Sequence, residues 1–115
     1  MRAAFPSLYH TEPGFYFECG DGWFTLLWRL SEQLQDMIVH VPPPEQAEYY
    51  ACQVKQKCGE LRFYLSNSTD EMFQATEAAL EESKQICEVC GASGHLLLDL
   101  GYLMTRCPTH TPPAH

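Results

Sequence analysis

The chain has few basic residues and no long hydrophobic run. Its 115 residues include 7 Lys and Arg against 15 Asp and Glu, which gives a formal net charge of −8. Binding to nucleic acid depends on clustered Lys and Arg, so this composition argues against a broad nucleic-acid-binding surface. The same charge disfavours anionic membranes and favours basic surfaces of other proteins as partners.

Membrane and export signals are also missing. No stretch approaches the roughly 20 apolar residues of a membrane-spanning helix. The opening MRAAFPSLYHTEPG contains early prolines and no apolar run of signal-peptide length. We therefore expect a soluble intracellular protein, whose oligomeric state stays open. In a reducing compartment its six cysteines are expected as thiols or metal thiolates rather than disulfides.

Signatures of common enzymes are not found either. The sequence has no Ser-His-Asp order, no phosphate-binding loop and no paired-carboxylate motif. We therefore expect a protein that is not an enzyme. The alternative is a zinc-dependent nucleic-acid-binding protein or small nuclease-like enzyme, for which His95, Asp99 and His110 are the residues to test.

The patterns that are present predict a small α+β fold: two amphipathic helices, a β-hairpin and a C-terminal zinc-ribbon or treble-clef-like knuckle. We expect a single domain over residues 1–115. A helix–hairpin–helix core covers 15–86, a zinc-binding part covers 87–110, and 111–115 form a tail.

The first helix is expected to follow Asp21, whose side chain can accept backbone N–H bonds of the first turn. Prolines at 42–44 end it. Its apolar residues recur at helical spacing and are expected to face the core. They are Trp23, Leu26, Leu27, Leu30, Leu34, Met37 and Ile38.

A β-hairpin is predicted next, because EYYACQVKQ and ELRFYLS flank a glycine-containing turn. With Cys58-Gly59 as a two-residue turn, Val54 pairs with Phe63 and Cys52 with Leu65 on the inner face.

The same register places Lys55, Lys57 and Arg62 together on the outer face of the hairpin. These cations are candidate partner-binding residues, and could contact two or three phosphates. The interpretation we favour is that they pair with the protein's own glutamates or stay solvated.

A second helix is predicted to start near Ser68, Thr69 and Asp70, where Ser68 and Glu71 match a capping box. Its expected inner stripe is Met72, Phe73, Thr76, Ala79, Leu80 and Ser83. On the outer side, Glu77, Glu81 and Glu82 are candidate partner-binding residues that could present a phosphate-like stripe to a basic groove. A solvated helix face without a partner is the alternative.

The segment CEVCGASGHLLLDLGYLMTRCPTH, residues 87–110, has the spacing of metal ligands. We expect Cys87, Cys90, Cys107 and His110 to bind one structural Zn²⁺, with two short strands in HLLLDLGYLMTR bringing the two pairs together. His95 and His115 are rivals for the fourth position. The alternative is that these cysteines are thiols without a metal.

Three cysteines remain outside this pattern, namely Cys19, Cys52 and Cys58. A second metal site with His10 or His40 is disfavoured because the spacings are irregular. Core or hairpin thiols are expected instead.

The chain carries Gly20-Asp21-Gly22-Trp23, Gln53-Val54-Lys55-Gln56-Lys57, Gly59-x-Leu61-Arg62-Phe63-Tyr64, Cys87-x2-Cys90-Gly91 and Cys107-x2-His110. Together, over roughly residues 15–110, these motifs resemble a family of small phage, prophage and bacterial proteins of unknown function. The chain departs from the pattern at Cys58, where an aromatic residue is expected.

The resemblance supplies no established activity. It implies a phage context in the bacterial host cytoplasm, where small acidic proteins often block host defence complexes by covering nucleic-acid-binding surfaces. The resulting hypothesis is an anti-CRISPR-like protein that binds a host complex through protein–protein contacts.

Overall fold

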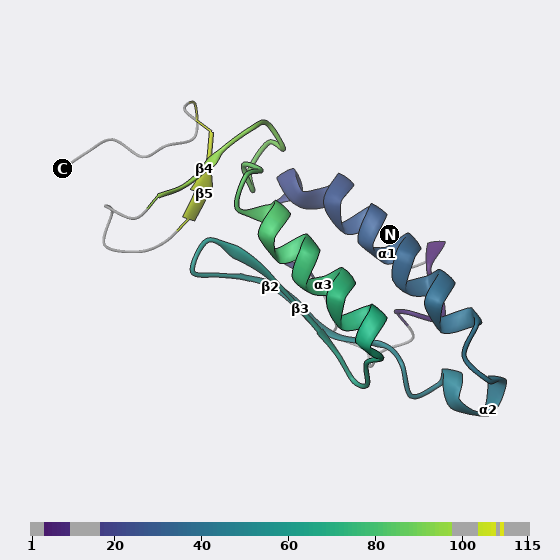
Figure 1. Ribbon diagram of the computed structural model, residues 1–115. Coiled ribbons are helices and arrows are strands. Elements are labelled where there is room, and N and C mark those ends of the chain that lie inside the picture. Colours follow the sequence, from purple (N-terminus) through teal and green to yellow (C-terminus); the bar gives the residue numbers. More distant parts are fainter. Residues whose placement is uncertain (1–3, 10–16, 98–103, 108, 110–115) are drawn as a thin grey trace.

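The computed structural model describes residues 4–9, 17–97, 104–107 and 109. In chain order its elements are β1 (Phe17–Glu18), the 3-10 helix η2 (Asp21–Trp23), α1 (Phe24–Val39), α2 (Pro43–Gln46), β2 (Ala51–Lys57), β3 (Glu60–Leu65), α3 (Asp70–Ser83), β4 (His95–Leu97) and β5 (Met104–Arg106). Helices α1 and α3 lie side by side, α3 runs along the β2–β3 hairpin, and β4 and β5 lie at one end (Figure 1). The fold is a mixed arrangement of helices with a three-stranded and a two-stranded sheet.

Helix α1 confirms the predicted apolar stripe. All residues of that stripe are buried except Met37, which is half-buried. The helix ends at Val39, before the prolines, as expected. The predicted cap is wrong: Asp21 lies inside η2, and the position before it is Gly20, which has no side chain with which to cap.

Strands β2 and β3 form the predicted hairpin, with Val54 opposite Phe63 and Lys55 opposite Arg62. The predicted pairing of Cys52 with Leu65 is wrong, because the register shifts between Ala51 and Gln53. Ala51 faces Leu65 instead, and Cys52 is exposed. The extra residue is the mark of a β-bulge, which hydrophobic alternation alone does not reveal.

Strand β1 was not predicted from the sequence. Its two residues pair in parallel with β2, Phe17 with Val54 and Glu18 with Lys55, so the sheet order is β1-β2-β3. Two residues are too few to show a strand period. The hairpin turn itself has φ of 56° at Cys58 and 80° at Gly59, which is the left-handed conformation that a two-residue type I′ turn needs.

Helix α3 begins at Asp70, within the predicted start, but the predicted capping residue is wrong. Thr69, not Ser68, is its cap, because the Thr69 Oγ1 accepts a hydrogen bond from the Met72 N–H at 3.2 Å. The predicted inner stripe is buried or half-buried except for Phe73, whose exposed fraction is 58%. That ring lies on the flank of α3, beside a groove at the edge of β3.

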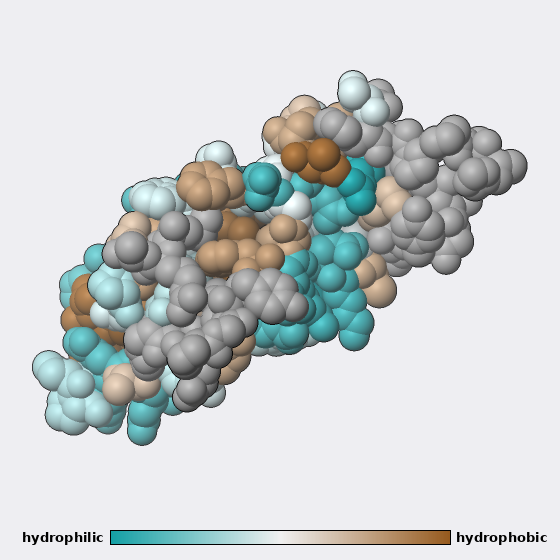
Figure 2. Space-filling view, turned by 180° about the vertical axis from the view of Figure 1, so that it is seen from behind, coloured by the Kyte–Doolittle hydropathy of each residue, from teal (hydrophilic) through white to brown (hydrophobic). Residues whose placement is uncertain are grey.

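The core lies between the helices and the hairpin, with Trp23, Leu30, Leu34, Val54 and Leu61 among its most buried side chains. Figure 2 shows that some hydrophobic side chains stay at the surface seen from behind, next to stretches of hydrophilic ones. None of the described helices is long and apolar enough to cross a membrane.

The C-terminal strands β4 and β5 are antiparallel, with His95 opposite Arg106 and Leu97 opposite Met104. The two strands predicted in HLLLDLGYLMTR are therefore confirmed. Their connection, and the predicted tail 111–115, lie outside the described residues.

Candidate metal centre

Three of the four predicted metal ligands come together. The Sγ atoms of Cys87, Cys90 and Cys107 all lie within 4.8 Å of one another, and the distance from Cys90 Sγ to Cys107 Sγ is 3.6 Å. Cys87 and Cys107 are buried, whereas Cys90 is exposed. None of the three forms a disulfide, which would require an S–S distance of about 2.0 Å.

A tight loop holds the first two thiols. The Cys87 N–H donates to the Ala92 carbonyl, and the Gly91 N–H donates to the Cys87 carbonyl, both at 2.8 Å. Gly91 has φ of 83°, a conformation that a residue with a Cβ rarely adopts. The loop therefore reverses beneath the thiols at the glycine that follows Cys90. We call residues 87–92 the knuckle.

The knuckle favours an ionised thiol at Cys87. Burial raises the pKa of this group, but hydrogen bonds from the backbone at Cys107, Cys90 and Val89 outweigh burial and lower its pKa to about 6. Backbone N–H groups that point at sulfur stabilise the thiolate, which is the form that binds metal.

The spacing of the sulfur atoms fits a tetrahedral metal ion. With Zn–S bonds of about 2.3 Å, the sulfur atoms of a tetrahedral site lie about 3.8 Å apart. The 3.6 Å between Cys90 Sγ and Cys107 Sγ is close to that value, and no pair exceeds 4.8 Å. The three cysteines could hold a metal ion without a change of fold.

The GDGW turn, residues 20–23, packs against the knuckle and is hydrogen-bonded to it and to the residue before it. The Gly22 N–H donates to the Glu88 carbonyl at 2.8 Å, and the Trp23 indole Nε1–H donates to the Ile86 carbonyl at 2.9 Å. A Cβ at Gly22 would lie 2.1 Å from the Cys87 carbonyl oxygen. The two backbones therefore approach as closely as they do only because this position is glycine.

Strand β5 supports the knuckle from the other side. The Arg106 guanidinium contacts the Glu88 carboxylate at 2.8 Å, and both side chains are mostly buried. Burial raises the pKa of Glu88, while Arg106 opposes the shift. One residue earlier, the buried Thr105 Oγ1 donates to the Gly59 carbonyl at 2.6 Å, so β5 is also fastened to the hairpin turn.

The predicted fourth ligand falls outside the residues that the structure describes. His110 and its rival His115 lie outside the described residues, as does Asp99. His95 is in β4, in register with Arg106. The arrangement of His95, Asp99 and His110 therefore lies outside what the structure describes.

The other cysteines form no second metal group within the described residues. Cys52 and Cys58 are exposed, and Cys19 is half-buried. Burial, with the nearby carboxylates of Glu88 and Asp21, raises the pKa of Cys19 to about 11. His10 lies outside the described residues.

The predicted acidic stripe is exposed but carries ion pairs. Glu81 contacts Lys84 at 3.2 Å, and Glu82 contacts Arg29 at 3.1 Å. For Glu77, which is also exposed, the described residues supply no ion pair. Exposed pairs of this kind are weak, so the stripe stays available to a partner.

The predicted cations share the outer face of the hairpin but are not equivalent. Arg62 contacts Glu60 at 2.5 Å. Lys84, the residue that follows α3, contacts the same carboxylate at 3.2 Å. Lys57 is exposed and Lys55 half-buried. Arg62 therefore pairs with one of the protein's own glutamates, as the favoured interpretation expects.

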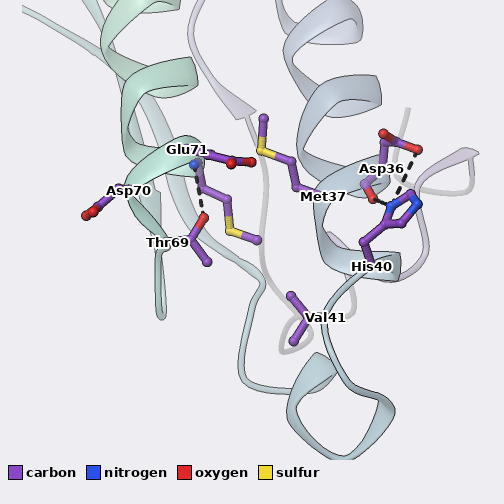
Figure 3. A pocket seen from close by; sticks show the side chains of 8 residues that line it. Asp36, Met37, His40, Val41, Thr69, Asp70 and Glu71 are labelled. Atoms are coloured by element: carbon purple, nitrogen blue, oxygen red, sulfur yellow. Dashed lines mark hydrogen bonds and ion pairs between the residues drawn. The ribbon is translucent and has the colours of Figure 1, made fainter.

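A larger cavity, of about 540 Å³, opens between the end of α1 and the start of α3. Figure 3 shows its mixed lining, with the carboxylates of Asp36, Asp70 and Glu71 around apolar side chains that include Met37. The His40 Nδ1–H donates to the Asp36 carbonyl at 2.6 Å at its rim. This surface adds to the acidic character of the helix pair.

Sequence reasoning missed the residues that support the knuckle. Gly22 belongs to the Gly20–Trp23 motif, for which the sequence predicts no contact with residues 87–92, and no pattern indicates Glu88, Thr105 or Arg106. The only available signal was the pair of glycines around Asp21, because glycine often marks a close backbone approach.

No protein-family model matches this chain, and neither a curated protein nor a solved structure shows significant similarity to it.

Proposed function

We propose that this protein holds one structural Zn²⁺ through Cys87, Cys90, Cys107 and His110, in a zinc-ribbon-like C-terminal part, and acts by binding another protein. The approach of the three Sγ atoms carries the metal assignment. A closed set of four ligands leaves no position for a reactive water, so the ion would stabilise the fold and not catalyse hydrolysis.

The chemistry of the donors supports zinc. Thiolates are soft ligands that favour zinc over magnesium or calcium, and imidazole suits zinc equally well. The knuckle supplies backbone N–H donors to Cys87, which offsets the charge that three thiolates bring together. Binding energies at such sites are on the order of 10 kcal/mol, which is comparable to the stability of a small domain.

Metal analysis of the purified protein tests the site. We expect zinc at close to one ion per chain, lost in Cys90→Ser. Cys58→Ser is the matched control, because Cys58 is also exposed but lies in the hairpin turn. Protein that carries no zinc, or equal zinc in both variants, would refute the assignment.

Single alanine substitutions at His110, His95 and His115 assign the fourth ligand. We expect His110→Ala to release zinc to a chelator much faster than the other two, because its spacing from Cys107 matches the knuckle pair. If His95→Ala has the larger effect, the fourth ligand is in β4.

A basic surface on a partner protein is the proposed target. The net charge of −8 and the exposed Glu77, Glu81 and Glu82 support this, since a negative stripe complements a groove that binds phosphates. A rigid, metal-held scaffold loses little conformational entropy on binding. The resemblance to phage proteins adds the proposal that the partner is a host defence complex of the CRISPR type.

Charge reversal tests the stripe. The immobilised chain is used to capture proteins from a bacterial extract. We expect the triple variant Glu77→Lys, Glu81→Lys and Glu82→Lys not to bind proteins that the natural chain binds. The matched control reverses Glu32, Glu45 and Glu48, which are exposed elsewhere and give the same change in net charge. Equal retention by both variants would exclude the stripe.

Zinc-dependent cleavage of DNA or RNA that His95→Ala abolishes would replace the proposal with the nuclease alternative.

A further inference from the structure

Among the described strands, β3 lies at the edge of its sheet and pairs with β2 alone. Lys57 and Glu60 flank the two-residue turn, so their backbone groups bond to each other, and the same holds for every second pair along the ladder. The backbone groups of Leu61, Phe63 and Leu65 therefore point away from β2.

One contact confirms this direction and marks where the free edge begins. The Leu61 N–H donates to the Ser83 Oγ at 2.9 Å, at the C-terminal end of α3. Within the described part of the chain, no such bond reaches the N–H groups of Phe63 and Leu65 across this edge. The edge is closed at Leu61 and open from Phe63 to Leu65.

A groove of about 230 Å³ lies along this open edge, between β3 and α3. Its lining includes Tyr64 and Phe73, with exposed fractions of 44% and 58%, together with Leu80. The exposure of Phe73, which the helical pattern did not predict, places an apolar wall directly opposite the unpaired strand edge. Figure 1 shows α3 running alongside this hairpin.

The groove lining contains one carboxylate and one cation, Glu77 and Arg62. Glu77 lines it and is exposed, and the described residues offer it no ion pair. The cation that also lines the groove, Arg62, contacts Glu60. A ligand with a basic side chain would therefore meet a carboxylate that no described cation contacts.

We propose that this groove binds a short extended segment of a partner protein, which adds a strand to the open edge of β3 and places a Lys or Arg beside Glu77. Strand addition satisfies the free backbone groups, and the wall of α3 selects alternate side chains. At about 3.3 Å per residue, the open edge from Phe63 to Leu65 pairs with about three residues of such a segment. The inference rests on the proposed protein-binding function and names its surface and mode.

The test uses zinc-loaded, ¹⁵N-labelled full-length protein and the acetylated peptide Thr-Val-Lys-Val-Thr. We expect the amides of Phe63 and Leu65 to shift and to gain protection from hydrogen exchange. The same peptide with Glu in place of Lys should bind up to about fivefold more weakly. A peptide N-methylated at both valines, which cannot complete the strand, should leave these amides unchanged.

Two exposed positions allow variants that keep the fold. Glu77→Lys should reverse the preference between the Lys and Glu peptides, and Phe73→Ala should weaken both. The double variant Glu81→Lys and Glu82→Lys is the control, because neither residue lines the groove. This variant should still prefer the Lys peptide, even if it no longer binds the partner protein. The experiment therefore tests the groove proposal separately from the proposal that the acidic stripe binds a partner.

The proposal is overturned if the peptide leaves the Phe63 and Leu65 amides unchanged, or if Glu77→Lys keeps the original preference. It is also overturned if sedimentation shows a dimer in which these amides are protected without peptide. In that case a second copy of the chain, and not a partner segment, occupies the edge.

Discussion

The backbone N–H of Gly22 donates to the carbonyl oxygen of Glu88 at 2.8 Å, and this bond joins η2, which precedes α1, to the loop that carries Cys87 and Cys90. The indole of Trp23 repeats the connection one residue later, through the Ile86 carbonyl. The GDGW turn and the cysteine knuckle are therefore one structural unit, although they are far apart in the sequence.

Gly22→Ala should destabilise the protein by about 2 kcal/mol or more, because its new Cβ would lie 2.1 Å from the Cys87 carbonyl oxygen and backbone would have to move. Urea unfolding of the zinc-loaded protein measures the loss. Asp21→Ala is the control and should change the free energy of unfolding by less than about 0.5 kcal/mol, because this exposed side chain does not cap the helix. A larger effect at Asp21 than at Gly22 would contradict the described contact.

Removal of the metal should be visible at Trp23. This indole is fully buried and bonded to the residue before Cys87, so loss of the ion should loosen the knuckle and expose it to water. The chain has two tryptophans, and in Trp28→Phe the fluorescence comes from Trp23 alone. We expect its emission to shift to longer wavelength when a chelator is added and to return with zinc. Unchanged emission from metal-free protein would show that the turn does not depend on the ion.

Cys58→Asn should raise the free energy of unfolding by roughly 0.5–1 kcal/mol. Cys58 has φ of 56°, which costs an ordinary side chain about 1 kcal/mol, whereas Asn is favoured at this position of a type I′ turn. Cys52→Asn is the matched control, because Cys52 is exposed on β2 and has no positive φ. A shift of the urea midpoint by the same amount in both variants would mean that the turn is not the cause.

Alkaline pH should destabilise the fold through Cys19. The folded thiol has a pKa of about 11, above its ordinary value of 9.0. The unfolded chain therefore loses this proton first, so the contribution is fully present below pH 9 and is lost as pH rises from 9 to 11. Urea unfolding across this range should show a shallower decline for Cys19→Ala than for Cys52→Ala. Tyr9, whose pKa burial raises to about 12, contributes a further loss in both variants.

Local patterns predicted the elements of this fold well. The apolar spacing from Trp23 to Ile38 identified the buried face of α1, and the Cys58-Gly59 turn fixed the pairs Val54–Phe63 and Lys55–Arg62. These features depend on residues close together in the chain, where a helical or strand period is visible.

Features that depend on distant segments were not predicted. The parallel pairing of β1 with β2 joins Phe17 to Val54, and the bulge beside Cys52 accompanies it. Phe73 fits a helical stripe by spacing, but only the position of β3 shows that it lies at the rim of the groove.

The candidate metal site also has some features that the sequence predicted and others that it did not. Cysteine spacing indicated Cys87, Cys90 and Cys107, which the structure brings within 4.8 Å. The support from Gly22, and the pairing of Glu88 with Arg106, could not be predicted, because neither leaves a periodic signal in the sequence. The choice of His110 as fourth ligand stays a prediction.

The contacts around the knuckle also bear on the order in which the chain folds. Trp23 and Ile86 are 63 positions apart, and Thr105 and Gly59 are 46 apart, so both contacts must close long loops. Such contacts are slow to form compared with the hairpin turn or the first turn of a helix. We therefore expect the hairpin turn and the helices to form first, and the knuckle and β5 to take their described positions against the GDGW turn and the hairpin turn late in folding.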